Sequence, residues 1–539
     1  MRSAVAGQAL LVAGAFLWNL VRHRTVTDDA FISYRYARHL VEGHGLVWNV
    51  GERVEGYTNF LWVMIEAAGL GLGMAPERLA PSLGIASGFA VLAALAWVTA
   101  RERGFGDPLV FAAPMALAVN RSFAAWSSSG LETSFFTLLA VLGSLALIRE
   151  LERDTPRPWL ASLILGLAAL TRPEGVLFFA VGALALVADA RSWRRAARSF
   201  SLYALPFIAL FGGHMLWRYA YYGFWLPNTF YAKVSGLWWE QSAFYFELLF
   251  ATYPIAWLLP LLPFAMLSGP RVTRILMIFP VPLWLGYLVA VGADYLEFRF
   301  MVPLFPFLCW GIVEGGRSVA AWLAERASAP RLAFWGSVAV GFALPLSMAV
   351  GSLRPAVEAS GITSIEAHGG FTEFRISQGR ELRELIREGV LPRELRIQTD
   401  AVGALPYFTG WYTFDSRGLN DLEIARKPLR ERGIVGHEHG ASVEETRERE
   451  IDAVIVNHQM LYDASDPSLA RAHQSAWLAV DHTNRAFGAH PGLRVICREI
   501  GGDRAILFAT VFDDARVRDR FGDLASCRFL GAQKRRPER

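Results

Sequence analysis

Two adjacent carboxylates, Asp28 and Asp29, are the residues of this chain best suited to do chemistry. They follow the first long apolar stretch, in the run Thr25-Val-Thr-Asp-Asp-Ala-Phe-Ile. Carboxylates are costly inside hydrocarbon and ordinary in water, so the pair belongs at a membrane boundary. A positioned carboxylate can remove the proton of a hydroxyl group while that hydroxyl attacks. Taken alone, the pair is explained as well by a structural role as by a catalytic one, the structural role being a solvated loop or the acidic start of an interfacial helix.

The composition of the chain is that of an integral membrane protein followed by a polar region. Its 539 residues are 53% hydrophobic and 13% aromatic, and the mean hydropathy is +0.29. Apolar blocks such as 4–20, 81–100 and 332–350 can cross about 30 Å of hydrocarbon as helices. From Arg354 onward no block is that long. We predict a transmembrane domain over 1–352, with a first external loop at about 22–78, and a C-terminal soluble α/β domain over 353–539.

Arginine-rich loops orient the predicted spans. Basic residues gather in short loops at 101–103, 191–198, 271–274 and 317–331. The apolar segments between these loops come in even numbers, so all four can lie inside. This predicts a polytopic helical protein of the inner (plasma) membrane with about 11 spans and an extracytoplasmic C-terminal domain. Segment 57–74 carries Glu66 and is expected to lie in the outer interface; if it crosses, the count is 12.

The predicted topology places five polar clusters on the outer face. A transporter would more naturally carry polar groups at mid-membrane depth, on broken helices repeated in two halves, and no such repeat is found. We therefore expect transfer of a group at the outer interface, with the lipid bilayer as a partner and no nucleic acid. Besides the acidic pair, the clusters contain these candidate substrate contacts: Arg35, Glu132, Arg172, Glu174, Asn228, Lys233, Asp294 and Arg299.

Three external cations are suited to hold a phosphate leaving group. A sugar carried on a lipid phosphate leaves that phosphate behind, and fixed positive charge stabilises it. Arg172, Lys233 and Arg299 are the candidates for this role. Structural alternatives remain open, because Arg172 can pair with Glu174 at a helix end. Likewise Arg299 can pair with Asp294 or extend its charge to the interface.

Several motifs together resemble the C-type (GT-C fold) membrane glycosyltransferases. More narrowly, they resemble the bacterial family that includes the terminal β-(1→2)-arabinofuranosyltransferase. The motifs are Asp28-Asp-Ala-Phe-Ile-Ser-Tyr-Arg, Ser129-Gly-Leu-Glu-Thr, Arg172-Pro-Glu-Gly, Leu226-Pro-Asn-Thr-Phe-Tyr-Ala-Lys and Thr399-Asp-Ala-Val-Gly-Ala-Leu-Pro-Tyr. One departure is Ala293, where a second glycine after Gly292 is expected.

The resemblance implies an inverting transferase with a polyprenyl-phosphate sugar donor and a cell-envelope glycan or glycolipid as acceptor. Arabinofuranose is one candidate for the sugar. The family's acidic pair falls on Asp28 and Asp29, and the analogy favours Asp28 as general base, although adjacency alone cannot rank the two. The rival interpretation is a non-catalytic GT-C-like envelope or flagellar assembly factor. The intact acidic pair favours the enzyme.

The C-terminal region has the pattern of a small α/β domain. Residues 381–388 alternate charge with Leu382, Leu385 and Ile386 at helical spacing. Short apolar runs at 395–399, 453–457, 493–497 and 505–509 predict strands. Asp400, at the end of the first of these strands, is a candidate substrate contact.

The sequence predicts neither a metal site nor a disulfide framework. His437 and His439 are too few for a Zn²⁺ site, which needs three or four ligands, and they are expected in a surface loop. No cofactor is certain, and a requirement for a divalent cation is left open. Cys309 is expected to be buried in an apolar block. Whether Cys497 and Cys527 pair is also left open.

Overall fold

The computed structural model describes residues 2–153, 155–190, 192–234, 236–267, 271–354, 361–428, 438–455, 461–463, 493–500, 505–512 and 520. The chain divides into two compact units. The first contains Met1–Thr27, Tyr57–Leu226 and Val234–Gly369, and the second contains Asp28–Gly56, Pro227–Lys233 and Gly370–Arg539. The sequence-based boundary was residue 353. In the structure, the last segment of the second unit starts at Gly370, and the unit also contains the two earlier segments 28–56 and 227–233.

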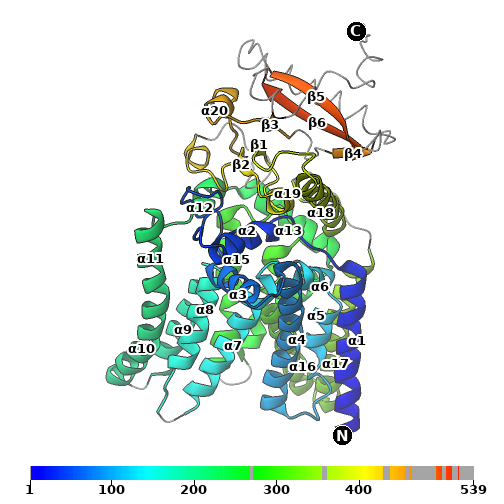
Figure 1. Cartoon of the computed structure of the whole chain (residues 1–539). Coiled ribbons are helices and arrows are strands. Elements are labelled where there is room, and N and C mark those ends of the chain that lie inside the picture. The colour runs from blue at the N-terminus through cyan, green and yellow to red at the C-terminus, as the bar shows by residue number, and fades with distance from the viewer. Residues whose placement is uncertain are drawn as a thin grey trace. The chain divides into compact units, whose positions relative to one another are not determined.

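The first unit is helical. Its long helices include α1 (Arg2–His23), α4 (Pro76–Arg103), α7 (Thr133–Leu151), α16 (Phe305–Arg326) and α17 (Pro330–Leu353). Figure 1 shows α4 beside α7 and α16 beside α17. Apolar side chains cover most positions of these helices, which suits burial in hydrocarbon. The remaining helices are α3 (Phe60–Gly71), α5 (Ala112–Ala118), α6 (Arg121–Ser128), α8 (Trp159–Thr171), α9 (Gly175–Asp189), α10 (Trp193–Phe207), α11 (Gly213–Tyr222), α13 (Trp239–Thr252), α14 (Arg271–Ile278) and α15 (Pro280–Val291).

Six helical segments in the described part of the chain are long and apolar enough to cross a membrane. A seventh is possible if Trp239–Thr252 and the 3₁₀ helix Ala256–Leu267, bent by 99°, form one span. The polytopic helical character is thus confirmed, whereas the count of about 11 stays a prediction. The difference arises because several expected spans are short helices. For example, α8 has 13 residues and α9 has 15, which rise about 20 Å and 22 Å against about 30 Å of hydrocarbon.

Two features of the first unit bear on particular segments. The helix α3, expected at the interface, has 12 residues, so it rises only about 18 Å. Between α10 and α11 the chain forms a π-helical turn, Ile208–Gly212, directly after Pro206. Proline has no N–H for the helix ladder, and such a turn is a common way to absorb that loss.

The second unit contains a mixed sheet. Its strands are β1 (Arg396–Thr399), β2 (Tyr412–Asp415), β3 (Ala453–Val454), β4 (Leu461–Asp463), β5 (Leu493–Ile500) and β6 (Ala505–Phe512). The strand β1 pairs in parallel with both β2 and β3, and β6 is antiparallel to β3, β4 and β5. Strands therefore occur at all four predicted places, whereas β2 and β4 were not predicted. That this region is a soluble, extracytoplasmic domain stays a prediction.

The helix α18 (Ile365–Arg387) covers the sheet with the apolar face expected from the sequence. Leu382, Leu385 and Ile386 pack against a buried cluster that contains Ile397 and Trp411. Amphipathic spacing therefore predicted correctly which face of this helix is buried.

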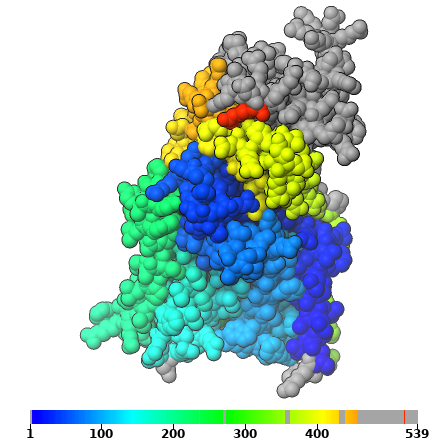
Figure 2. Space-filling model, in the orientation of Figure 1, coloured from blue at the N-terminus to red at the C-terminus, as the bar shows by residue number. Residues whose placement is uncertain are grey.

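The first loop of the chain belongs to the second unit. Its helix α2 (Ala30–Val41) packs against α19 (Ala404–Thr409), and Phe31 contacts the rings of Tyr407 and Phe408. Figure 2 shows the blue residues of this loop beside yellow residues of the C-terminal region. The short helix α12 (Asn228–Lys233), a 3₁₀ turn Ile424–Arg426 and α20 (Val443–Glu448) complete the described elements of this unit.

Candidate active site

Asp28 is held by the start of helix α19. Its side chain is 5% exposed. One carboxylate oxygen accepts the N–H of Gly403 at 2.9 Å and the other accepts the N–H of Ala404 at 2.8 Å. Hydrogen bonds from N–H groups to an ionised acceptor are among the stronger ones in proteins. Asp28 therefore anchors the turn between β1 and α19.

Gly403 is required for this close approach. A Cβ atom at this position would lie 2.0 Å from the carbonyl oxygen of Asp28 and 2.4 Å from its Oδ2. Neither contact can be relieved without moving backbone or breaking the hydrogen bond. The Asp400-Ala-Val-Gly motif thus carries a glycine for a packing reason that involves the first loop.

Asp29 has a different environment from its neighbour. It stands at the N-cap position of α2 and is half-buried, and its side chain makes no cap hydrogen bond to that helix. The two adjacent carboxylates, which the sequence cannot rank, are therefore distinguished by the tertiary structure. Asp28 accepts two backbone N–H groups of the turn before α19, whereas Asp29 stands at the N-cap position of α2.

Arg35 is a structural residue of the first loop. Its guanidinium donates to the carbonyl oxygens of Trp48 (2.9 Å), Pro406 (2.8 Å) and Trp411 (2.9 Å). It is 3% exposed, and burial together with the charge of Arg38 lowers its pKa to about 9. All three of its nitrogens are occupied by protein oxygens. The structure therefore gives no support to the predicted substrate contact at Arg35.

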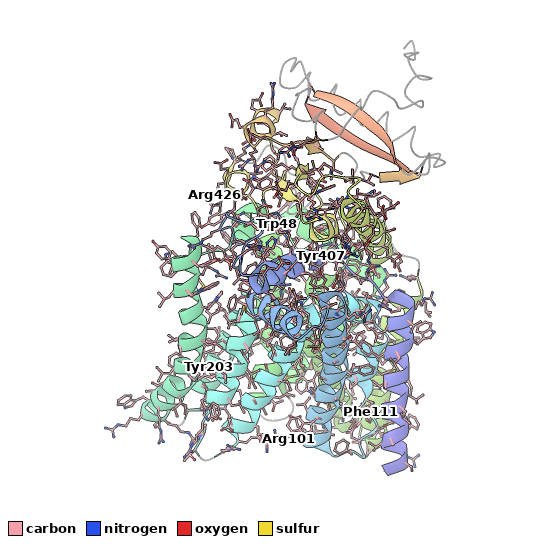
Figure 3. The ribbon with its side chains drawn as sticks, viewed as in Figure 1. Trp48, Arg101, Phe111, Tyr203, Tyr407 and Arg426 are labelled. Atoms are coloured by element: carbon pink, nitrogen blue, oxygen red, sulfur yellow. The ribbon has the colours of Figure 1, made fainter. Side chains whose placement is uncertain are left out.

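Asn228 is likewise occupied within the second unit. Its amide nitrogen lies 2.8 Å from the carbonyl oxygen of Gly418 and 3.1 Å from that of Asp421. Its side-chain oxygen accepts from Arg426 at 2.9 Å. Figure 3 labels Arg426 together with Trp48 and Tyr407, which come from three separate stretches of the chain. Lys233 ends the same short helix and is half-buried.

Asp400 lies at the carboxyl edge of the parallel strands. Because β1 and β2 run in parallel, Asp400 and the turn after Asp415 meet at the same edge, where ligands of α/β sheets commonly bind. Asp400 is half-exposed and lies 4.0 Å from Arg417. Asp415 is buried, which raises its pKa to about 6, and it accepts the N–H groups of Arg417 and Asn420. Asp415 therefore shapes the turn, and Asp400 is the accessible carboxylate.

In the first unit, Arg172 is the centre of a buried polar network. It donates to Glu132 at 2.8 Å and to Glu174 at 2.9 Å. Asn59 donates to Glu132 at 2.9 Å, and the Tyr287 hydroxyl donates to Glu174 at 2.6 Å. The structural alternative that the sequence left open, pairing of Arg172 with Glu174, is the observed arrangement, with Glu132 as a second partner. Within the described residues, Nε of Arg172 and Oε2 of Glu174 are buried without a hydrogen-bond partner.

Arg299 lies close to this network. It pairs with Asp294 through two contacts of 2.7 and 3.2 Å. The guanidinium carbons of Arg172 and Arg299 lie 4.9 and 5.0 Å from the centre of the Phe300 ring. The structure thus brings these two predicted cations to one aromatic ring. Lys233, the third, belongs to the other unit.

The turn that carries Asp294 and Arg299 has a strained backbone. Ala293 and Phe298, neither of them a glycine, have φ angles of 61° and 50°. This left-handed region disfavours side chains that have a Cβ atom. The glycine expected at Ala293 from the family resemblance would suit the observed backbone. Strain of this kind is commonly found at functional sites.

Sequence reasoning missed Arg375, which is fully buried on α18, and Tyr287 in the first unit. Neither stands in a recognisable motif. Among the described residues there is no group of three or more His, Cys, Asp or Glu able to hold a metal ion. His437 and Cys527 lie outside the described residues, as does the side chain of Cys497. Cys309 is buried, as predicted.

Comparisons with known proteins find similarities in sequence and in fold. Residues 372–505 match the model of a family described as a domain of unknown function (DUF8728). The terminal β-(1→2)-arabinofuranosyltransferase of Mycobacterium tuberculosis is 30% identical over 253 residues, which are 43% of this chain and 39% of that protein. The protein of the same description from Corynebacterium glutamicum is 28% identical over 261 residues, or 43% and 37%. The match therefore spans about two fifths of each curated relative.

The similarity in fold to solved structures extends over nearly the whole chain. The crystal structure of ArnT from Cupriavidus metallidurans bound to undecaprenyl phosphate aligns with a TM-score of 0.57 at 13% identity, covering 96% of this chain and 99% of that one. The apo structure gives 0.53 at 14% identity, covering 95% and 99%. The predicted resemblance to the C-type membrane glycosyltransferases is thus confirmed. The two arabinofuranosyltransferases support it in sequence, and the two ArnT structures support it in fold.

Proposed function

We propose that this chain, which resembles the C-type membrane glycosyltransferases, transfers a sugar from a polyprenyl-phosphate donor to a hydroxyl of a cell-envelope glycan or glycolipid. The named arabinofuranosyltransferases support arabinofuranose as the sugar. The undecaprenyl phosphate bound to ArnT supports a lipid-linked donor. We place the reaction on the outer face of the inner membrane, where the predicted topology puts the acidic pair.

The hydrogen bonds of Asp28 carry the mechanistic part of this proposal. We assign Asp29 as the general base and Asp28 as the residue that anchors α19, which reverses the order favoured by family analogy. A carboxylate that already accepts two backbone N–H groups is poorly suited to turn toward a substrate. Asp29 is the neighbouring carboxylate, and it is half-buried at the start of α2.

The proposed reaction is a direct displacement. The acceptor hydroxyl gives its proton to Asp29 while its oxygen bonds to the anomeric carbon from the face opposite the phosphate. The bond from that carbon to the phosphate oxygen breaks, and its electron pair leaves with the polyprenyl phosphate. This sequence inverts the anomeric centre. The negative charge that develops on the leaving phosphate needs fixed positive charge.

Arg172 and Arg299 are the cations we propose for that charge, with Lys233 as a third candidate. Two observations support the first two. Both guanidiniums lie against the Phe300 ring. In addition, the buried Nε of Arg172 has no hydrogen-bond partner in the part of the chain that the structure describes, so it can donate to a ligand oxygen. Glu132, Glu174 and Asp294 then serve to orient the two cations.

The test is a transfer assay on purified full-length protein with a panel of radiolabelled polyprenyl-phosphate sugars. Asp29→Asn should reduce turnover about 10²- to 10⁴-fold, the usual cost of losing a general base, without lowering the melting temperature. Asp28→Asn should lower both the turnover and the melting temperature, because an amide offers the backbone N–H groups only one acceptor oxygen. Glu42→Gln, at the exposed end of α2, is the matched control. Arms with chelator and with added divalent cation test the metal requirement.

Full turnover in both Asn variants would remove the main support for the enzyme. Transfer from none of the donors by the wild-type protein would do the same, and a non-catalytic GT-C-like assembly factor would then be the better interpretation. Full loss in Asp28→Asn with normal folding and normal turnover in Asp29→Asn would exchange the two roles.

A further inference from the structure

Glu297 carries a buried carboxylate that the proposed reaction does not use. It is 2% exposed and lies two residues before Arg299. Its Oε1 accepts from Nε of Arg121 at 2.8 Å and lies 2.6 Å from Nη2 of the same guanidinium. Its Oε2 accepts the backbone N–H of Ile365, the first residue of α18, at 3.0 Å. The two carboxylate oxygens therefore bind groups that lie 176 and 68 residues away in the sequence.

The backbone of Glu297 is also tied to other parts of the first unit. Its N–H donates to the carbonyl oxygen of Thr363 at 3.1 Å, and its carbonyl oxygen accepts from Nε1 of Trp126 at 2.8 Å. Beside it, Leu296 forms a parallel bridge with Thr363, whose N–H donates to the carbonyl oxygen of Tyr295 at 2.7 Å. These bonds join the turn to α6 and to the chain just before α18.

The same bonds restrain a turn whose backbone is strained. Phe298, the residue after Glu297, is fully buried and has a φ of 50°, and Ala293 has a φ of 61°. A residue with a Cβ atom keeps such a conformation only where its surroundings fix it. Arg299 follows directly and pairs with Asp294 through contacts of 2.7 and 3.2 Å. The direction in which Arg299 leaves the turn therefore depends on the conformation at Phe298.

Arg121 and Trp126, both on α6, are the partners that hold Glu297 from that helix. Arg121 is 1% exposed, and its third nitrogen, Nη1, donates to the carbonyl oxygen of Arg354 at 3.0 Å. All three guanidinium nitrogens thus bind protein oxygens, so Arg121 serves to hold Glu297 in place. The ring centre of Trp126 lies 6.0 Å from the guanidinium carbon of Arg299. The same short helix therefore contacts both Glu297 and Arg299.

We infer that Glu297 is a positioning residue for the donor phosphate. Held by Arg121 and by the start of α18, it fixes the turn from which Arg299 reaches that phosphate. Glu297 touches no substrate in this role and acts through Arg299. The inference rests on the proposed function, in which Arg299 helps to hold the phosphate.

The test compares the binding of two lipids, undecaprenyl phosphate and undecaprenol, to the purified full-length protein in detergent. The wild type should bind the phosphate form more tightly. In Glu297→Gln we expect the affinity for undecaprenyl phosphate to fall about 10-fold or more, the usual effect of losing a hydrogen bond to a charged group. The affinity for undecaprenol should not change. A merely structural role predicts equal losses for the two lipids, and that result, like an unchanged affinity for both, would overturn the inference.

A matched control and a double variant show whether the effect passes through Arg299. Glu366→Gln removes an exposed carboxylate of the same helix start, which lies 3.5 Å from His23, and should leave both affinities at wild-type values. In an Arg299→Met background, Glu297→Gln should cause little further loss of affinity for undecaprenyl phosphate, because the two changes then act on one contact. A further loss as large as in the wild-type background would overturn the inference.

Two further outcomes are decided in advance. If Glu297→Gln does not fold, Arg121→Met combined with Glu297→Gln replaces it and should show the same selective loss, because removing both partners of a buried ion pair is better tolerated than removing one. A wild type that binds the two lipids equally would overturn the phosphate-holding part of the proposed function, and the inference with it. A wild type that prefers the phosphate form, together with an equal preference in Glu297→Gln, would overturn the inference alone.

Discussion

At the scale of single residues, tertiary contacts give the adjacent aspartates Asp28 and Asp29 different environments. Asp28 accepts N–H groups of Gly403 and Ala404, while Asp29 stands half-buried at the N-cap position of α2. Arg35 and Asn228 also belong to the family motifs, and their side chains donate hydrogen bonds to backbone carbonyl oxygens of the same unit. A polar residue in a motif can therefore serve the fold of the site without touching the substrate.

His39 provides a prediction at this scale. It lies on α2 with Nδ1 2.9 Å from the carbonyl oxygen of Val47, and burial together with the charge of Arg35 lowers its pKa to about 4. An unfolded histidine has a pKa near 6.5. The folded state therefore loses stability relative to the unfolded state as pH falls. The reason is that only the unfolded chain takes up a proton at His39 between about pH 6.5 and pH 4. His39→Gln removes this penalty.

We expect wild type to lose up to about 3 kcal/mol of unfolding free energy relative to His39→Gln between pH 7 and pH 4. Denaturant titrations in detergent at pH 7, 6, 5 and 4 measure the difference. The control is His44→Gln, at an exposed neighbouring histidine. Parallel pH curves for wild type and His39→Gln would contradict the prediction.

At the scale of secondary-structure elements, short helices and turns are stabilised by contacts from distant segments. The helix α19 has only six residues, and isolated helices of that length are unstable in water. It forms because Asp28 binds its first N–H groups and α2 packs against it. In the first unit, the 12-residue helix α3 carries the buried Glu66.

Gly403→Ala tests the turn before α19. The added methyl group would collide with the backbone of Asp28, which cannot move aside as a flexible side chain would. We expect a loss of about 1–3 kcal/mol in unfolding free energy, typical of overpacking, and a loss of turnover comparable to Asp28→Asn. Gly370→Ala, with open space around the helical position, is the control and should not destabilise. Normal stability and turnover in Gly403→Ala would show that the turn tolerates a side chain.

Glu66→Leu tests the short helix of the first unit. Glu66 is 1% exposed, and neither of its carboxyl oxygens has a hydrogen-bond partner among the described residues. Burial of an unsatisfied polar group costs about 1–3 kcal/mol, so we expect Glu66→Leu to raise the melting temperature in detergent. Loss of turnover without any gain in stability would instead identify Glu66 as a functional group.

At the scale of the whole molecule, the second unit is assembled from three separate segments of chain. Arg35 binds the carbonyl oxygens of Pro406 and Trp411, Asn49 binds the carbonyl oxygen of Thr413, and Asn228 binds that of Gly418. These bonds are buried, so a segment expressed without its partners leaves polar groups unsatisfied. The C-terminal region should therefore depend on the first loop for its stability.

We expect residues 353–539 alone to melt at a lower temperature than the same residues fused to 28–56 through a flexible linker. Circular dichroism melting curves of the two proteins measure the difference. In the fused protein, Arg35→Met together with Asn49→Ala should lower the melting temperature most of the way to that of residues 353–539 alone. Equal melting temperatures for the two original proteins would show that the C-terminal region folds independently of the first loop.

The sequence by itself determined the features that depend on local periodicity and composition. Apolar blocks predicted membrane helices, and the spacing of Leu382, Leu385 and Ile386 predicted the buried face of α18. Apolar runs predicted strands where β1, β3, β5 and β6 are found. These properties reside within a few consecutive turns or residues of chain, so no distant partner is needed to recognise them. Motifs also predicted the resemblance to the C-type membrane glycosyltransferases.

Only the tertiary structure decided which motif residues, Asp28 among them, form hydrogen bonds within the protein. The reason is sequence distance: Asp28 and its partner Gly403 are 375 residues apart, and Arg35 and Trp411 are 376 apart. Burial of Arg375 follows from the packing of α18 on the turn 399–404, which no local pattern encodes. Hydrogen bonds and burial depend on where distant segments meet, and that information appears only when the chain has folded.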